Sequence, residues 1–265
     1  MISLVQLLRE AQGSPKAIIL AGAPGAGKGY ILRGLDLGGL KVMNIDDIYI
    51  NMLKKANVSL DLKNATPEER SEQAKQMAAA NKQFKGEMEQ IIAGKESFIL
   101  DGTAASYNTT AKLKNELDEA GYDVFMLYVY TDLERSLSQN QDRYVKSGGK
   151  DRSLAPAIVM RTWKSVTDNL PKYEELFGNN FVAVANTLDD RMQDIDKIIN
   201  KYLKPFTPQG TIPKTPAQQK KSDERKAQDK EEIQAMLSDD FIYDVIEYTM
   251  SKEEAQMRLK QFLSK

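Results

Sequence analysis

The sequence predicts an α/β protein: a three-layer fold with a five-stranded, mainly parallel sheet and a helical appendage at its C-terminal end. Five short apolar segments carry this prediction: KAIILA, KVMNID, SFILDG, DVFMLYVY and FVAVAN. Their apolar residues are consecutive rather than alternating, which is typical of parallel strands covered on both faces. Helical stretches separate the segments, and this alternation of strand and helix is the pattern of a three-layer domain.

Composition narrows the function classes. The net charge of −1 provides no global basic field, which argues against non-specific capture of long nucleic acid. The chain has no cysteine and no histidine, so acid–base work must fall to carboxylates, lysine or tyrosine. No apolar run approaches the ~20 residues of a membrane span. The first segment, MISLVQLLREAQG, predicts a packed helix rather than a signal peptide, so we expect a cytoplasmic protein with no membrane partner.

The chain divides into a main domain and a tail. We expect the main domain to span residues 1–203, with a helical insertion at 48–96 after the second strand and a lid at 132–155 after the fourth. An insertion after a strand's carboxyl end lies over the binding edge of an open sheet, where it can hold a substrate. Residues 204–232 predict a linker that is first proline-rich and then charged, the charged part being either a solvated helix or a disordered run. Residues 233–265 regain helical periodicity and should pack on the main domain or on a partner.

The residues between the first strand and the next helix form a phosphate-binding motif. G-x-x-x-x-G-K runs from Gly22 to Lys28, directly after a strand and before a helical stretch. Glycines allow backbone N–H groups to turn around phosphate oxygens, and Lys28 neutralises the transferred group. A glycine-rich turn without a ligand is the alternative. The predicted nucleotide-binding residues are Gly22, Ala23, Pro24, Gly25, Ala26, Gly27, Lys28, Gly29 and Tyr30.

Three carboxylates follow the neighbouring strands. Asp46 and Asp47 end the second strand and Asp101 ends the third, so all three should meet at the edge that carries the phosphate loop. Asp101 suits holding Mg²⁺ through water, as a Walker B carboxylate does. Asp46 or Asp47 suits accepting the proton of an attacking hydroxyl. The alternative makes these residues helix caps and turn residues.

Basic residues follow the fourth strand. Ser136, Asn140 and Arg143 recur at helical spacing and should share one face, and Arg152 follows the flexible stretch SGGK. Arginines on a mobile segment can stabilise the charge on a transferred phosphoryl group once the segment closes. We therefore predict catalytic roles for Arg143 and Arg152 beside Lys28, with solvated surface arginines as the alternative.

The loop GAPGAGKG resembles that of adenylate kinases and their nucleoside monophosphate kinase relatives, in which glycine also follows the lysine. Mg²⁺ can keep several waters and bind mainly to substrate phosphates, so Gly29 does not by itself remove the site. The family usually has threonine next, where this chain has Tyr30. The Phe-Pro-Arg continuation of adenylate kinases is absent after Asp101 and Gly102, which counts against mononucleotide specificity.

Residues 15–200 together resemble the P-loop kinase group that contains the phage polynucleotide 5′-kinase and the zeta-toxin kinases. The resemblance implies a P-loop NTPase fold. The Asn-x-Asp-Asp string of the polynucleotide kinase matches Asn44, Asp46 and Asp47, and its first aspartate is the family's catalytic base. The resemblance therefore implies that Asp46 is the base.

Other family positions are only partly kept. The strand-three aspartate and threonine match Asp101 and Thr103, with Gly102 inserted. The lid pattern Arg-Asn-x-x-Arg appears as Gln139, Asn140 and Arg143, so the first arginine is lost. Tyr49 replaces the arginine that grips acceptor phosphate, which puts recognition of nucleic-acid ends in doubt.

These features lead us to expect a kinase that uses ATP and Mg²⁺ and transfers a phosphoryl group to an unidentified hydroxyl or phosphate acceptor. A polynucleotide or nucleotide acceptor and a sugar-nucleotide acceptor both remain open. The competing expectation is a catalytically weak nucleotide-binding assembly or interaction protein, with a protein partner bound through residues 233–265. The altered family positions favour this second expectation; they are Gly29, Tyr30, Tyr49 and Gln139.

Overall fold

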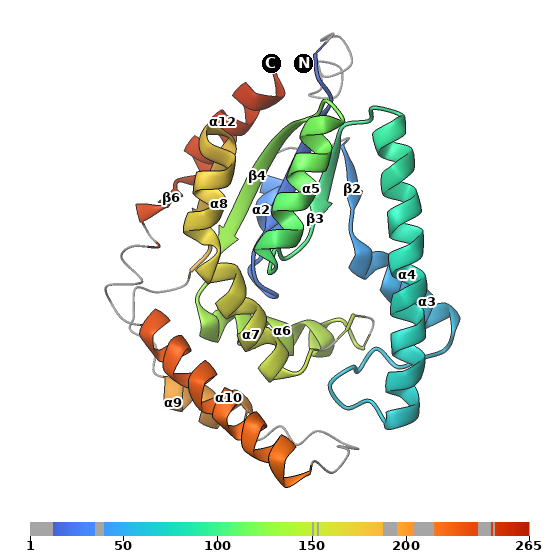
Figure 1. Cartoon of the computed structure of the whole chain (residues 1–265), viewed down its shortest axis with the longest axis vertical. Coiled ribbons are helices and arrows are strands. Elements are labelled where there is room, and N and C mark those ends of the chain that lie inside the picture. The colour runs from blue at the N-terminus through green and yellow to red at the C-terminus, as the bar shows by residue number, and fades with distance from the viewer. Residues whose placement is uncertain are drawn as a thin grey trace.

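The computed structural model describes residues 13–34, 40–149, 151–152, 154–187, 195–203, 215–237, 245 and 247–264. The packed helix expected at the start of the chain falls on residues 1–12 and lies outside this part. The fold is α/β with a parallel sheet, as predicted (Figure 1). The strands lie in the order β2-β3-β1-β4-β5-β6, and all neighbouring pairs are parallel. Their bounds are β1 Lys16–Ala21, β2 Lys41–Met43, β3 Phe98–Asp101, β4 Asp123–Tyr130, β5 Phe181–Ala185 and β6 Thr249–Met250.

The sheet has six strands, so the predicted count of five is wrong. The additional strand, β6, pairs Thr249 with Ala183 and Met250 with Val184 at the edge beyond β5. It lies in the tail for which the sequence predicted only helices. A strand of two residues shows no apolar run, which is why the sequence pattern did not reveal it.

The two central strands explain the stability of the sheet. All six residues of β1 and seven of the eight residues of β4 are buried. Both strands have neighbours on each side and helices on each face, so consecutive residues must be apolar. The bounds expected from KAIILA and DVFMLYVY agree with β1 and β4 residue for residue.

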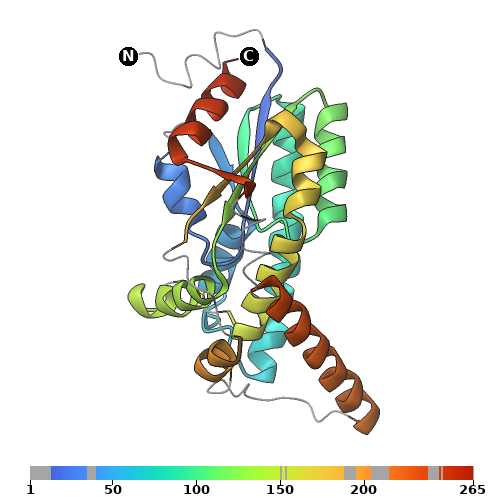
Figure 2. The same cartoon turned by 90° about the vertical axis from the view of Figure 1, so that its left-hand side faces the viewer.

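Helices cover both faces of the sheet. Side chains from α4, α5 and α8 pack on one face, with Ile91, Leu117 and Tyr173 among the buried residues. Side chains from α2 and α12 pack on the other face, and Figure 2 shows these two helices on the side of the sheet opposite α5 and α8. The helices on the two faces are α2 Lys28–Gly34, α4 Pro67–Ala93, α5 Tyr107–Glu119, α8 Leu170–Phe177 and α12 Lys252–Leu263.

The insertion after β2 consists of α3 (Ile45–Lys55) and α4. The stretch Thr66-Pro67-Glu68-Glu69 predicts a helix start, and the structure has a complete capping box there, with Pro67 in the first turn and the Thr66 amide donating to Glu69 Oε2. The helix ends at Ala93, with Gly94 as its C-cap. A small apolar cluster of its own joins α3 and α4 through Leu53 and Ala80, so the insertion is a packed unit beside the sheet.

Side chains from four further helices form a third apolar cluster. These helices are α6 Leu133–Lys146, α7 Pro156–Asp168, α9 Ile195–Ile198 and α10 Pro216–Met236. The buried Trp163 of α7 lies at the centre of this cluster and donates from its indole N–H to the carbonyl oxygen of Thr131 at 2.8 Å. Lys164 joins α7 to α10, because its Nζ lies 2.6 Å from Glu232 Oε2 and 3.0 Å from Asp168 Oδ2.

The charged segment predicted as part of a linker is therefore a helix where the structure describes it, since α10 covers residues 216–236 and buries only Ile233 and Met236. The proline-rich part up to residue 214 lies outside the described residues. The tail packs on the main domain through α12, one of the two arrangements expected for it. Within the described part of the chain, no helix has the length and apolar character that a membrane crossing requires.

Candidate active site

The phosphate loop, residues 22–29, connects β1 to α2 at the carboxyl edge of the sheet. Gly22, Gly25 and Gly27 have φ values of 146°, 77° and 80°, which other residues rarely adopt. A Cβ at Gly22 or Gly25 would lie 2.6 Å from a backbone carbonyl oxygen. The three glycines are thus required by both backbone conformation and close packing, which supports a built loop over an incidental turn.

Side chains from distant segments hold the loop in this conformation. The Ser136 hydroxyl of α6 donates to the carbonyl oxygen of Pro24. In the amide orientation that satisfies both neighbours, Gln139 donates to the carbonyl oxygen of Gly25 at 2.8 Å and accepts from Arg135 Nε at 2.8 Å. Asn186, which follows β5, donates to the carbonyl oxygen of Ala26 at 2.7 Å. These side-chain contacts use carbonyl oxygens rather than the N–H groups of the loop. Two of those N–H groups bond to backbone, Gly22 to the carbonyl oxygen of Thr103 at 3.2 Å and Ala26 to that of Ala23 at 3.0 Å.

Lys28 bends back over the loop. Its Nζ donates to the carbonyl oxygens of Gly22 at 3.0 Å and Ala23 at 3.4 Å. Burial lowers the pKa of Lys28, the negative charges of Asp101 and Asp46 raise it, and two lid arginines lower it. The charges of four residues that the sequence singled out therefore act on this one ammonium group: Asp101, Arg143, Asp46 and Arg152.

Asp101 ends β3 and lies beside Lys28, as predicted from its strand position. Its Oδ2 accepts a hydrogen bond from Asn44 Nδ2 at 2.9 Å. Within the described residues its buried Oδ1 has no hydrogen-bond partner. Burial raises the pKa of Asp101, and the positive charge of Lys28 opposes that rise. A buried carboxylate oxygen without a partner fits a ligand that supplies positive charge or a bound water.

The donor set near Asp101 fits Mg²⁺ better than a metal that needs many protein ligands. In the part of the chain that the structure describes, no three acidic side chains are placed closely enough to hold a metal ion by themselves. Mg²⁺ is commonly bound by one or two carboxylates, with waters and substrate phosphates completing its shell. Asp101 therefore suits the water-mediated role expected of it.

The structure corrects the expected position of Asp46 and Asp47. The second strand ends at Met43, Asn44 caps the next helix by accepting from the Asp46 amide at 2.8 Å, and both aspartates lie in the first turn of α3. The helix begins early because an Asn side chain satisfies a free N–H at its start. Burial raises the pKa of Asp47, and the negative charge of Asp46 adds to this effect. Both aspartates still reach the carboxyl edge of the sheet.

The lid residues divide into two groups. Ser136 and Asn140 are buried, and Asn140 Nδ2 donates to the carbonyl oxygen of Leu154 at 3.0 Å. Arg143 is half exposed, and its Nε lies 3.4 Å from Asp151 Oδ2. Arg152, largely buried, donates to Asp46 Oδ2 in an ion pair. Both predicted lid arginines thus reach the site, and Arg152 already contacts the carboxylate predicted to be the base.

The glycines of the stretch in which a flexible hinge was expected have left-handed backbone conformations. Gly148 and Gly149 have φ values of 61° and 78°, directly after α6. Tyr144, one turn before them, packs against the apolar cluster that contains Tyr49 and Leu53 of α3. The lid therefore contacts the insertion, and Tyr49 is a buried packing residue rather than an exposed acceptor contact.

Sequence reasoning missed one residue that holds the phosphate loop, Asn186. Asn186 follows a predicted strand end, but its contact with the loop is tertiary and leaves no local signal.

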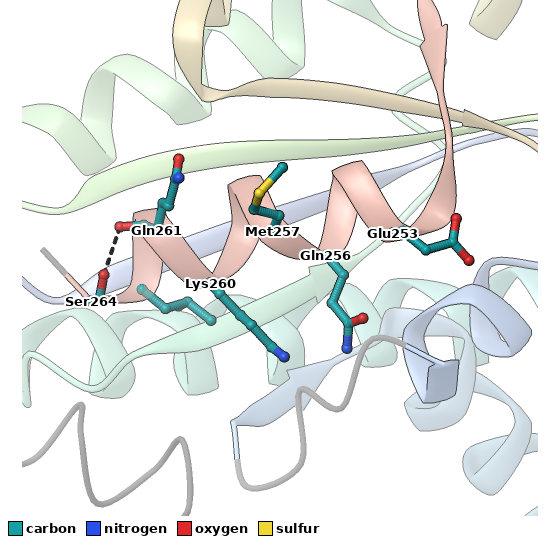
Figure 3. A pocket seen from close by; sticks show the side chains of 7 residues that line it. Glu253, Gln256, Met257, Lys260, Gln261 and Ser264 are labelled. Carbon is teal, nitrogen blue, oxygen red and sulfur yellow. Dashed lines mark hydrogen bonds between the residues drawn. The ribbon is translucent and has the colours of Figure 1, made fainter.

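A hollow with a cavity volume of about 580 Å³ lies elsewhere, along the exposed side of α12 (Figure 3). The side chains drawn there, including Glu253, Met257 and Lys260, belong to that helix, apart from its C-cap Ser264. None of the charged residues around Lys28 lines it. This hollow therefore forms no part of the candidate active site.

Comparison with solved structures finds the same fold in the AvrRxo1-ORF1:-ORF2 complex. In the form solved with ATP, the TM-score is 0.53 with 15% identity, covering 99% of this chain and 85% of that one. In the native form, the TM-score is 0.53 with 18% identity, covering 71% of this chain and 60% of that one. The PezAT chromosomal toxin–antitoxin system of Streptococcus pneumoniae gives a TM-score of 0.48 with 13% identity, covering 89% of this chain and 95% of that one.

No curated protein matches the chain significantly. The Zeta toxin family model matches residues 4–200, which include β1 to β5, the phosphate loop, the insertion and the lid. The match covers well over half of the chain, and the parallel sheet with its phosphate loop agrees with it. The chain belongs to the Zeta toxin family, a P-loop kinase-like family.

Proposed function

We propose that this protein is a phosphotransferase that moves the γ-phosphoryl group of ATP to a hydroxyl or phosphate acceptor. The observation that supports this most is the convergence of charges on Lys28. Asp101, Asp46, Arg143 and Arg152 come from three different segments, and each shifts the pKa of the one lysine in the phosphate loop. A site that brings carboxylates and arginines to a phosphate-binding lysine has the charged parts that phosphoryl transfer requires.

ATP is the proposed donor. The phosphate loop presents N–H groups that the side chains supporting it do not use, and Lys28 can exchange its two carbonyl partners for phosphate oxygens. The protein of similar fold in the AvrRxo1-ORF1:-ORF2 complex has been solved with ATP. Family membership and this likeness together support ATP over other phosphoryl donors.

In the proposed reaction, the oxygen of the acceptor hydroxyl bonds to the γ-phosphorus as the bond from that phosphorus to the β–γ bridging oxygen breaks. The hydroxyl proton passes to the carboxylate of Asp46, and ADP leaves with the bridging oxygen. Arg152 contacts Asp46 in the structure, so it lies where a γ-phosphate would meet the acceptor. Arg152 and Arg143 stabilise the charge on the transferred group.

Mg²⁺ bound near the orphaned Oδ1 of Asp101 would neutralise charge on the phosphates. The acceptor would lie beneath the 48–96 insertion, because α3 carries Asp46 at that side of the site. Tyr49 is buried and offers no positive charge, so the insertion contributes no arginine there for an acceptor phosphate. The acceptor class stays open between polynucleotides or nucleotides and sugar nucleotides.

The test measures transfer from ATP labelled at the γ-phosphate, with Mg²⁺, to three acceptor classes: 5′-hydroxyl oligonucleotides, nucleoside monophosphates and sugar nucleotides. Asp46→Asn should lower turnover by about 100-fold or more, the usual contribution of a general base. Lys28→Ala should remove both turnover and ATP binding. Lys260→Ala, on the exposed side of α12, is the control and should match the wild type.

Two outcomes would contradict the proposal. Full turnover in Asp46→Asn would show that another group takes the proton. ATP binding without a labelled product from any of the three classes would replace the kinase by a nucleotide-binding protein that uses ATP as a structural ligand or switch.

A further inference from the structure

The β3–α5 loop, residues 102–105, contains an alanine in a backbone conformation that alanine rarely adopts. The φ of Ala104 is 53°, in the left-handed region. Within the described residues, the other positive φ values outside glycine belong to Asn57 and Lys95, and each of these directly follows the C-cap of a helix, where this conformation is usual. Ala104 follows a strand, so helix termination does not explain it. Strain of this kind persists only where the surrounding structure holds it, and it gathers at functional sites.

Two buried side chains from the junction of α7 and α8 hold the β3–α5 loop. The Tyr173 hydroxyl donates to the carbonyl oxygen of Ala104 at 2.7 Å. Asn169 Nδ2 donates to the carbonyl oxygen of Ala105 at 3.1 Å. The Tyr173 ring is completely buried and packs against the ring of Tyr107, with 5.6 Å between the ring centres. Packing thus fixes the ring that presents the hydroxyl group to the strained residue.

The β3–α5 loop is joined to two parts of the candidate active site. The amide of Gly22, the first residue of the phosphate loop, donates to the carbonyl oxygen of Thr103 at 3.2 Å. Asp101, whose buried Oδ1 has no hydrogen-bond partner within the described residues, directly precedes the β3–α5 loop. A change of backbone conformation at Ala104 would therefore move both the start of the phosphate loop and the carboxylate expected to hold Mg²⁺ through water.

We propose that Tyr173 and Asn169 are positioning residues of the active site, a proposal that rests on the function proposed above. They hold Ala104 in its left-handed conformation, and the β3–α5 loop in turn fixes Gly22 and Asp101. Neither side chain needs to contact a ligand, because its effect passes through the backbone of the loop. A residue that adopts the left-handed conformation without strain should therefore make the Tyr173 hydroxyl dispensable.

The experiment measures the affinity for ATP with Mg²⁺ by isothermal titration calorimetry in variants that remove the hydroxyl group, the strain or both. Tyr173→Phe should weaken ATP binding by about two- to tenfold, because a hydrogen bond contributes a net ~0.5–1.5 kcal/mol. Ala104→Gly should bind ATP within about twofold of the wild type, since glycine adopts a positive φ as readily as a negative one. The double variant Tyr173→Phe, Ala104→Gly should match Ala104→Gly, again within about twofold.

Tyr122→Phe is the matched control. The buried Tyr122 hydroxyl also donates to backbone carbonyl oxygens, those of Ile91 and Glu96, each at 3.0 Å. Tyr122 directly precedes β4, so it lies at the end of the strands opposite the phosphate loop. Its loss should lower the melting temperature and leave the ATP affinity unchanged. Asn169→Ala should weaken ATP binding in the same range as Tyr173→Phe, and circular dichroism confirms that each variant is folded.

The outcomes separate the positioning role from general destabilisation and from the proposed function. Wild-type ATP affinity in both Tyr173→Phe and Asn169→Ala would overturn the positioning role and leave the proposed function standing. A loss in Tyr173→Phe that Ala104→Gly does not reverse would also overturn it, since the hydroxyl group would then not act through Ala104. So would an equal loss in Tyr122→Phe, because any buried hydroxyl would then have the same effect. A wild type that binds no ATP would overturn the proposed function and this inference together.

Discussion

Gly27→Ala tests whether the phosphate loop depends on Asn186. Gly27 has a φ of 80°, and a Cβ added there would lie 2.2 Å from Asn186 Nδ2. That nitrogen donates to the carbonyl oxygen of Ala26 at 2.7 Å, in a buried contact. The methyl group cannot fit unless the Asn186 side chain moves, and its movement breaks the hydrogen bond.

Two separate effects lower the free energy of unfolding of Gly27→Ala. A residue other than glycine in the left-handed region costs ~1–2 kcal/mol. Breaking the buried hydrogen bond and leaving the Ala26 carbonyl unpartnered costs ~1–3 kcal/mol. We therefore expect Gly27→Ala to lower the free energy of unfolding by ~2–5 kcal/mol. Asn186→Ala alone should lose the hydrogen bond, at ~1–3 kcal/mol.

The double variant distinguishes this mechanism from simple backbone strain. With Asn186 replaced by alanine, the methyl group of Gly27→Ala meets no obstacle and only the backbone cost remains. The double variant should therefore lose less than the sum of the two single variants, by about the shared ~1–3 kcal/mol. Urea unfolding of all four proteins measures the difference. Losses that add to within ~0.5 kcal/mol would refute the argument, because independent sites behave in that way.

Three further predictions concern the lid and the third cluster. Arg152→Gln should lower phosphoryl transfer by about 100-fold or more and leave ATP binding measurable, because Asp46 keeps its place in α3; unchanged transfer would remove Arg152 from the reaction. Trp163→Phe should lower the free energy of unfolding by ~1–3 kcal/mol, because it leaves a buried carbonyl oxygen without its donor; a thermal melt equal to that of the wild type would contradict this. Burial lowers the pKa of Lys164, but the hydrogen bonds that it donates to Glu232 and Asp168 outweigh burial and raise the pKa above its ordinary value. The stabilisation by Lys164 is present below pH 10.5 and is lost as the pH rises through the folded-state pKa. The difference in free energy of unfolding between the wild type and Lys164→Met, measured in urea, should therefore shrink over that pH range. A difference that widens would contradict this direction.

The sequence predicted the fold well where its signal was local. KAIILA and DVFMLYVY agree with β1 and β4 because strands buried on both faces are apolar at nearly every position. The exceptions are the first residues, Lys16 and Asp123, which form an ion pair. The start of α4 was predicted because Thr66 and Glu69 form the complete cap. The second strand was predicted too long, since NID continues an apolar run while Asn44 already caps the next helix. That asparagine was the signal for the correct boundary.

The candidate site was predicted in part for the same reason. Lys28, Asp46 and Asp101 follow motif positions and Arg152 follows the stretch SGGK; the structure brings them together, though their chemical roles stay predictions. Asn186 could not be predicted, because its contact with the loop joins residues 160 positions apart. Its neighbours along the chain say nothing about that contact.

The packing of α12 has a practical consequence for work with shortened forms of this protein. Four of its side chains cover the sheet face on which Phe125 and Leu127 lie; they are Ala255, Leu259, Phe262 and Leu263. A fragment limited to the family-matched region would expose that apolar surface to solvent and would tend to aggregate or to bind chaperones. A protein that binds such a fragment could do so through this newly exposed apolar surface rather than through a specific binding site. Expressed fragments should therefore extend through residue 264.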